Sequence, residues 1–271
     1  MVMIEADCRD RQTDRAESFF KMKEMYLAMR QADESYDGEL LSASGLVGGD
    51  GKRFAERLAA GNSLCGDFIG TVMARALRMG ESNACMKRIV AAPTAGSCGV
   101  LPAVLLTMEE KLGCTLNEMT EAMYVAAGIG RIIAERAFLS GAAGGCQAEI
   151  GSASAMAAGA AVYLKDGDCD MICHAAALAL KNLLGLACDP VAGLVEIPCV
   201  KRNVLGAVNA LTSADMALAG IRSAIPPDEV IDAMRSIGTC MSPTLRETGE
   251  GGLAATPTGV QIAKEIRANL S

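Results

Sequence analysis

Three predicted loops combine cysteine with glycine or proline between long apolar segments: Pro93–Gly99, Gly141–Gly151 and Cys188–Asn203. Cys146 lies in the second loop, while Cys188 and Cys199 lie in the third. Thiolates on loops can hold an inorganic cluster, because bridging sulfides need backbone room and N–H donors. Free cysteine is more often a buried, inert side chain. From the residues alone, both roles stay open.

The other cysteines are expected to carry no chemistry. The chain has 11 cysteines but no CxxC pair, which argues against zinc ribbons, thioredoxin-like motifs and ferredoxin-type runs. The charged N-terminus has no apolar signal segment, so we expect no disulfide framework. Cys98 stays undecided, and Cys8 is expected to be exposed. We expect buried apolar fillers at Cys65, Cys85, Cys114, Cys169, Cys173 and Cys240.

The Pro93–Gly99 loop could bind an anion. Its Gly-Ser-Cys-Gly stretch directly precedes a predicted helix, and backbone N–H groups at such a position can point at a negative charge. A substrate carboxylate is one candidate. A tight turn that merely starts a buried helix is the more common role of such a stretch.

Histidine is scarce, and this limits the reaction classes. His174 is the single histidine, so Ser–His–Asp triads and histidine-rich zinc sites are hard to build. We interpret His174 as a satisfied core or helix-end residue. A general base would then be a lysine, a carboxylate or a group from another chain, with Lys201 as a weak candidate. Glu149 and Glu196 lie near the loop cysteines and either order the site or face water.

The elements that must position these loops are predicted to be helices. Hydrophobic residues make up 51% of the chain and aromatic residues 3%, so the core must use small side chains, which suits closely packed helices. Strand-like alternation is nearly absent. The fold class is therefore all-α, an Ala/Gly-rich helical domain with the cysteine loops between helices. Helical patterns span 17–32, 51–60, 67–79, 100–112, 117–138, 152–164, 171–186, 205–216 and 228–236.

The chain divides into two predicted parts. The lack of a signal segment and of a membrane-spanning pattern predicts a cytoplasmic protein. We interpret 1–40 as a polar helical segment with a loose start and 41–271 as the domain that carries the site. The net charge of −7 disfavours nucleic acid as a partner. No segment has the pattern of a membrane span.

Several segments resemble the α chain of the iron–sulfur-dependent L-serine dehydratases. The resemblance covers roughly residues 40–260, and its longest match runs from Lys181 to Asn203. The other matching segments are Ser42–Asp50, Asn83-Ala, Ile89–Gly99, Gly144–Ala153 and Glu250–Ala254.

The resemblance implies a 4Fe–4S cluster held by Cys146, Cys188 and Cys199, with one iron open to substrate. That iron would act as a Lewis acid in β-elimination, turning L-serine into pyruvate and ammonia. Such a lyase would serve amino-acid degradation and gluconeogenesis and would be oxygen-sensitive. The resemblance also implies an all-helical domain. The substrate-binding residues that it implies are Ser44, Gly45, Thr94, Ala95, Gly96 and Ser97.

Three features depart from the family pattern. The histidine-containing β portion of family members is missing from this chain, which predicts a separate β subunit that supplies the base. The chain ends in Arg267–Ser271 rather than in the cysteine that can cap a resting cluster, and Lys87 replaces an expected small residue. The same loops would suit a threonine dehydratase, a cysteine desulfidase or a non-catalytic iron–sulfur scaffold subunit.

Overall fold

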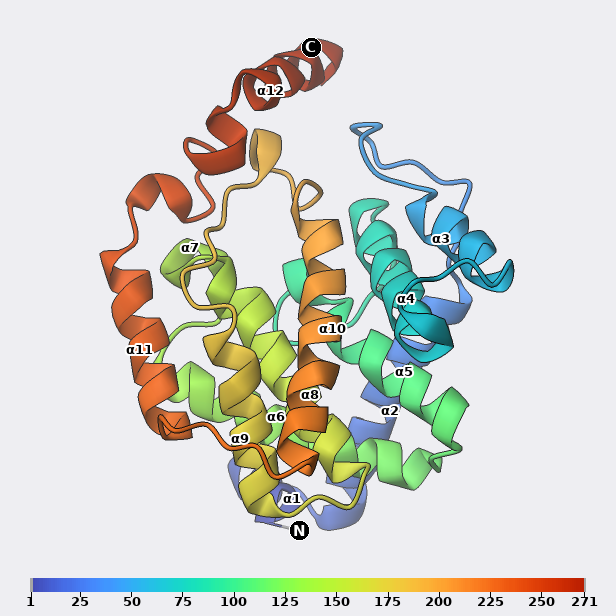
Figure 1. Ribbon diagram of the computed structural model, residues 1–271, viewed down its shortest axis with the longest axis vertical. Helices are drawn as coiled ribbons and strands as arrows, with labels where there is room; N and C mark the ends of the chain where they lie inside the picture. The colour runs from blue at the N-terminus through green and yellow to red at the C-terminus, as the bar shows by residue number, and fades with distance from the viewer. Residues whose placement is uncertain (1, 271) are drawn as a thin grey trace.

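The computed structural model describes residues 2–270 and is built from helices (Figure 1). Within this part of the chain there are twelve α-helices, several short 3₁₀ or π turns and no β-strand. An isolated bridge joins Cys188 to Arg246. The all-α prediction is confirmed. None of the described helices combines the length and the apolar character that a membrane crossing requires.

Most predicted helices are present, with differences at several ends. Residues 2–11 form a helix where a loose start was expected, and a last helix follows residue 256, where none was expected. Another begins at Cys199 rather than at Leu205. The bounds are α1 Val2–Arg11, α2 Arg15–Glu34, α3 Asp50–Ala59, α4 Gly66–Ala84, α5 Val100–Leu112, α6 Leu116–Arg136, α7 Gly141–Gly144, α8 Ser152–Tyr163, α9 Cys169–Lys181, α10 Cys199–Leu218, α11 Pro227–Cys240 and α12 Pro257–Leu270.

Helix α8 is the centre of the core. Residues Ser152–Val162 are all buried, and the helix packs against α5, α6, α9 and α10 (Figure 1). This close approach requires small side chains. At Gly159, a Cβ atom would lie 2.2 Å from Cδ1 of Ile129, which is too close for any larger residue. The scarcity of aromatic residues is thus explained by helices packed around a thin central one.

The site loops lie at one end of this bundle. In Figure 1 the segment before α10 is at the end from which α12 projects, and the N-terminus is at the opposite end. A capping box begins α6, since Thr115 Oγ1 accepts from Glu118 N and Thr115 N donates to Glu118 Oε2. Such caps fix the helix ends that carry the loops.

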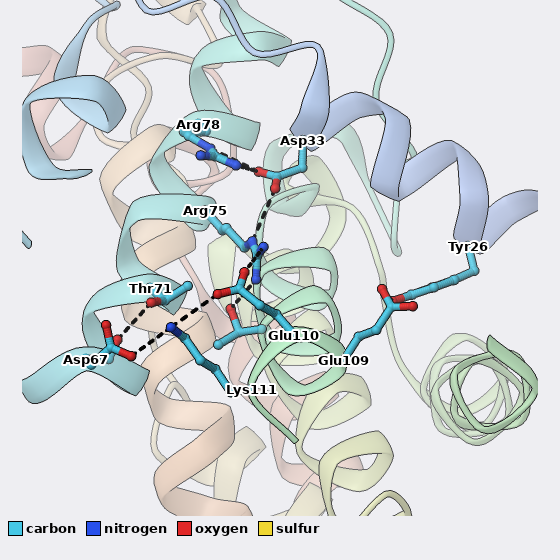
Figure 2. A network of polar contacts seen from close by, with 10 residues as sticks. Tyr26, Asp33, Asp67, Thr71, Arg75, Arg78, Glu109, Glu110 and Lys111 are labelled. Atoms are coloured by element: carbon cyan, nitrogen blue, oxygen red, sulfur yellow. Dashed lines mark hydrogen bonds and ion pairs between the residues drawn. The ribbon is translucent and has the colours of Figure 1, made fainter. Parts of the chain in front are cut away.

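A buried carboxylate joins α2 to α4 (Figure 2). Asp33 is 6% exposed and accepts from Arg75 Nε at 3.2 Å and from Arg78 Nη2 at 2.5 Å. Arg75 also binds Glu110 on α5, at 2.6 Å. Lys111, also on α5, forms an ion pair with Asp67 on α4 at 2.7 Å. These ion pairs hold three helices in register on the side of the bundle that carries α3.

Replacing Asp33 by alanine should lower the free energy of unfolding by about 3 kcal/mol, because two arginines lose a shielded partner. Urea denaturation followed by circular dichroism measures this change. Lys21→Ala, which removes a solvent-exposed pair with Glu17, should leave the midpoint unchanged. Equal midpoints for all three proteins would contradict this role of Asp33.

Candidate active site

Gln147 joins the loop of Cys146 to the segment that precedes Cys188. Its side chain is fully buried, and its Oε1 accepts from Gly185 N at 2.9 Å. Its Nε2 donates to Gly144 O at 2.9 Å and to Met234 O at 3.1 Å. The backbone adds a bond from Gln147 N to Leu186 O. Two loops far apart in sequence are thereby brought together.

Cys188 is held by backbone bonds on both sides. Its N–H donates to Leu245 O at 2.8 Å, and its carbonyl accepts from Glu247 N at 2.7 Å. Glu247 has a φ of 65°, a left-handed conformation that is uncommon for residues other than glycine. The segment after α11 therefore fixes the position of this cysteine.

The first turn of α10 places two polar side chains beside Cys199. Arg202 lies near the Cys146 thiol, whose pKa its positive charge lowers, and donates to Ala187 O at 2.7 Å. Arg202 also pairs with Asp189 Oδ1 at 2.9 Å. Since residues i, i+3 and i+4 share a helix face, this turn directs Arg202 and Asn203 towards the cysteine loops.

Asn203 binds the predicted anion loop to the same turn. It is 1% exposed, and its Oδ1 accepts from Gly99 N at 2.8 Å. Its Nδ2 donates to Gly96 O at 2.9 Å and to Cys199 O at 3.0 Å. The Thr94–Gly99 turn is therefore rigidly connected to the start of α10.

The three predicted ligands lie within electrostatic reach of one another. All three are buried, at 2%, 3% and 8% exposure for Cys146, Cys188 and Cys199. Burial raises the pKa of Cys146 to about 11 and that of Cys199 to about 12. Burial also raises the pKa of Cys188, and the nearby Glu149, Cys146 and Cys199 raise it further. The structure thus brings together three thiols from two loops that are far apart in the sequence.

Glu149 projects into the same region from a π-helical turn. This turn, Gln147–Gly151, directly follows Cys146, and such turns are frequent at functional sites. The carboxylate is 9% exposed, lies 3.9 Å from Cys188 Sγ and accepts from Thr94 Oγ1 at 2.7 Å. Burial raises the pKa of Glu149, whereas the hydrogen bond from Thr94 lowers it.

The predicted substrate-binding residues lie on two loops that reach the cysteine loops. Ala95, Gly96 and Ser97 form a 3₁₀ turn capped by Thr94, and the first N–H groups of a helix have no intrahelical acceptor. Ser44 Oγ donates to Glu196 Oε2 at 2.5 Å. Gly45 follows in the same segment, with a φ of 75°.

Several other sequence predictions have clear outcomes. His174 is satisfied as expected, because its Nδ1 accepts from Ser223 N at 3.2 Å. Lys201 lies on the exposed side of α10 and binds Asp50 at 2.6 Å. Cys98 is buried, and Cys8 is partly buried rather than exposed. The prediction of buried fillers was wrong: the side chains are partly or fully exposed at Cys65, Cys85, Cys114, Cys169, Cys173 and Cys240.

The thiols suit a cluster better than a single ion. Across residues 2–270, no three Cys, His, Asp or Glu side chains are grouped closely enough for one metal ion. A single ion draws its sulfur ligands to about 2.3 Å, whereas a cluster receives each thiolate on a different iron. Gly141 packs closely against Cys188, because a Cβ there would lie 2.7 Å from Cys188 Sγ. Thiolates are the usual ligands of iron–sulfur clusters, so the donor set fits such a cluster.

Comparison with known proteins gives the family. A family profile described as "Serine dehydratase alpha chain" matches residues 1–254. The chain belongs to the serine dehydratase alpha chain family. It is 48% identical, over 98% of its length and 88% of the relative's, to the "Probable L-serine dehydratase, alpha chain" of Bacillus subtilis.

Family members differ in how much of their length this chain matches. The "L-serine dehydratase, alpha chain" of Peptoniphilus asaccharolyticus is 47% identical over 82% of this chain and 76% of that protein. The "L-serine dehydratase" of Helicobacter pylori is 42% identical over 70% of this chain but only 42% of that protein. Some family members thus carry a long portion outside the match.

Arg202, Asn203 and Gln147 are site residues whose roles sequence reasoning missed. The spacing from Cys199 could have identified Arg202 and Asn203. They follow Cys199 at i+3 and i+4 and so share its helix face, whereas Lys201 at i+2 faces away. That signal requires a helix that begins at Cys199, and the predicted helix began at Leu205.

Burial should make the three clustered thiols slow to alkylate in metal-free protein at pH 8. A raised pKa keeps a thiol protonated below that pKa, and only the thiolate reacts. Iodoacetamide labelling with peptide mass spectrometry should modify Cys65, Cys169 and Cys240 first. Labelling of Cys146 and Cys199 should accelerate about tenfold per pH unit between pH 8 and 10. Early, pH-independent labelling of Cys146 and Cys199 would contradict the described burial.

Proposed function

We propose that this chain is the α subunit of an L-serine ammonia-lyase that converts L-serine to pyruvate and ammonia. Family membership supports the activity. The observation that carries the proposal is the convergence of Cys146, Cys188 and Cys199 beside two loops able to hold a small anion.

A 4Fe–4S cluster is the proposed cofactor, held by the three thiolates of Cys146, Cys188 and Cys199. When bound, it supplies a Lewis acid at the iron that lacks a protein ligand, which assists departure of the β-hydroxyl group. Arg202 contributes positive charge beside the Cys146 thiol, which favours the deprotonated ligand. Asp189 and Ala187 O fix that guanidinium in place.

The substrate carboxylate is proposed to bind at the capped 3₁₀ turn. The N–H groups of Ala95 and Gly96 begin this turn, and a helix start attracts anions. Thr94 and Ser97 complete the turn, and Ser44 and Gly45 approach from the other loop. Glu149 keeps Thr94 in position through its 2.7 Å hydrogen bond, which orders the turn before substrate arrives.

The general base is proposed to come from a separate β subunit, which also completes the site. His174 is bound to Ser223 N, and the Lys201 ammonium is paired with Asp50. The alpha chain designation of the relatives supports a heteromeric enzyme. We further propose that this enzyme is cytoplasmic and that air inactivates it.

Replacing any one of the three ligands by serine should abolish cluster binding. Anaerobic reconstitution with iron and sulfide should give the wild-type chain a broad thiolate-to-iron absorbance that air bleaches. The Cys146→Ser, Cys188→Ser and Cys199→Ser variants should stay colourless and bind little iron. Cys114→Ser alters a partly exposed thiol and is the matched control. Equal iron content in all four variants would refute the ligand assignment.

The reconstituted chain with its β subunit should release pyruvate from L-serine under anaerobic conditions. Parallel assays with L-threonine and L-cysteine test the related lyase activities, because the ligand loops alone do not select the β-substituent. Cys188→Ala should lower turnover at least a thousandfold, since the leaving hydroxide loses its stabilisation. Turnover unaffected by Cys188→Ala would instead assign this chain a scaffold role.

A further inference from the structure

Glu196 binds two serine hydroxyl groups across the site. Its Oε2 accepts from Ser42 Oγ at 3.0 Å and from Ser44 Oγ at 2.5 Å. These serines lie about 150 residues earlier in the chain, whereas Glu196 lies in the loop between Cys188 and Cys199. One carboxylate therefore joins the serine segment to the cysteine loop.

The two serines use the same hydroxyl groups to shape their own turn. Ser42 Oγ accepts from Val47 N at 3.3 Å, and Ser44 Oγ accepts from Leu46 N at 3.1 Å. Each hydroxyl thus donates to Glu196 and accepts from the backbone of its own segment. Removing the carboxylate frees both hydroxyl groups to rotate, and the turn loses its side-chain bonds to the cysteine loop.

The environment of Glu196 makes these hydroxyl bonds necessary. The residue is 6% exposed, and no salt bridge involves it within the described part of the chain. A shielded carboxylate without a cation depends on hydrogen-bond donors. The neighbouring backbone is also fixed, because Val200 N donates to Glu196 O at 3.1 Å as α10 begins. The backbone of Glu196 is therefore held by the same helix start that carries Cys199.

Two further contacts connect the serine segment to the same part of the fold. Lys201, two residues after Cys199, binds Asp50 at 2.6 Å where the segment enters α3. Glu81 on α4 is 1% exposed and accepts from Asp50 N and Gly51 N at 2.7 and 3.1 Å. These contacts fix the end of the segment. Glu196 binds the side chains of its Ser42–Gly45 turn, whose backbone is also closed by bonds from Ser42 N to Val47 O and from Gly45 N to Ser42 O, both at 2.8 Å.

We propose that Glu196 is a positioning residue, which sets the Ser42–Gly45 turn for substrate binding through its hydrogen bonds to Ser42 and Ser44. This inference rests on the proposed function for its substrate, L-serine. Glu196 itself acts through the two serines, so its loss weakens substrate binding more than the chemical step.

The test measures L-serine kinetics and backbone exchange in the reconstituted αβ enzyme. Glu196→Ala should raise KM for L-serine about tenfold, equivalent to about 1.4 kcal/mol, with kcat within about twofold and iron content unchanged. Glu196→Gln, which keeps an acceptor oxygen, should lie between wild type and Glu196→Ala. Ser42→Ala/Ser44→Ala should reproduce the rise in KM, and adding it to Glu196→Ala should raise KM no further. Glu196→Gln decides the question if Glu196→Ala fails to fold, because it leaves both serines in place.

Hydrogen exchange gives a readout that does not depend on turnover. The amides of Leu46 and Val47 should exchange faster in Glu196→Ala than in wild type, because their serine acceptors become mobile. Glu109→Ala is the matched control, since Glu109 also accepts a hydroxyl bond from a distant helix, from Tyr26 at 2.7 Å. The Glu109→Ala variant should change neither KM for L-serine nor the amide exchange rates of Leu46 and Val47.

The two proposals fail in different ways. Unchanged KM and unchanged exchange in Glu196→Ala would overturn the positioning role while leaving the lyase activity intact. A parallel loss of iron from Glu196→Ala would also overturn it, by assigning Glu196 to the cluster loop instead. A wild-type enzyme that turns over no L-serine would refute the proposed function, and exchange alone would then decide whether Glu196 orders the turn.

Discussion

Desolvation of three thiols at one place constrains everything around them. Burial favours the neutral thiol, with a pKa of about 11 at Cys146 and about 12 at Cys199, so the thiols alone do not attract one another. The loops must be held together by other bonds. Gln147 and the backbone of Cys188 supply them. The polypeptide's own hydrogen bonds thus hold the arrangement and offset part of the entropy lost in ordering these loops.

The charged side chains near the thiols are one cation and two carboxylates, and they are held in different ways. Arg202 is the cation that contacts a cluster thiol, and it is fixed by Asp189. The carboxylates of Glu149 and Glu196 receive hydroxyl donors instead of cations. Each carboxylate therefore connects one anion-binding loop to one cysteine loop. A buried carboxylate without a paired cation is unfavourable unless its donors stay in place, so the four loops are expected to order together.

The sequence predicted the helical class and most helices because small-residue packing is a property of whole segments. The Ala-rich run 152–164 became α8, which needs its glycine and alanines to approach four neighbours. Residues 2–11 and 257–270 were missed since their patterns are weak. The cysteine ligands came from a resemblance, because the residues alone left their role open. The anion loop was suggested by its Gly-Ser-Cys-Gly stretch before a helix, and the resemblance added its substrate-binding residues. Cys65 and Cys240 are exposed although buried positions were predicted, which shows that the presence of a cysteine does not indicate whether its side chain is buried.

The roles of Arg202 and Asn203 show where prediction from sequence ended. A shift in the start of α10 from Leu205 to Cys199 changes which side chains share a face with the thiol. With the helix begun at Cys199, Lys201 faces Asp50 and solvent, whereas Arg202 and Asn203 contact the cysteine loops. The bond from Asn203 Nδ2 to Cys199 O closes the first helical turn on itself and simultaneously holds the anion loop through Gly96 and Gly99. A single helix start therefore positions a proposed ligand, a cation and the substrate turn, and a small displacement of it would separate all three.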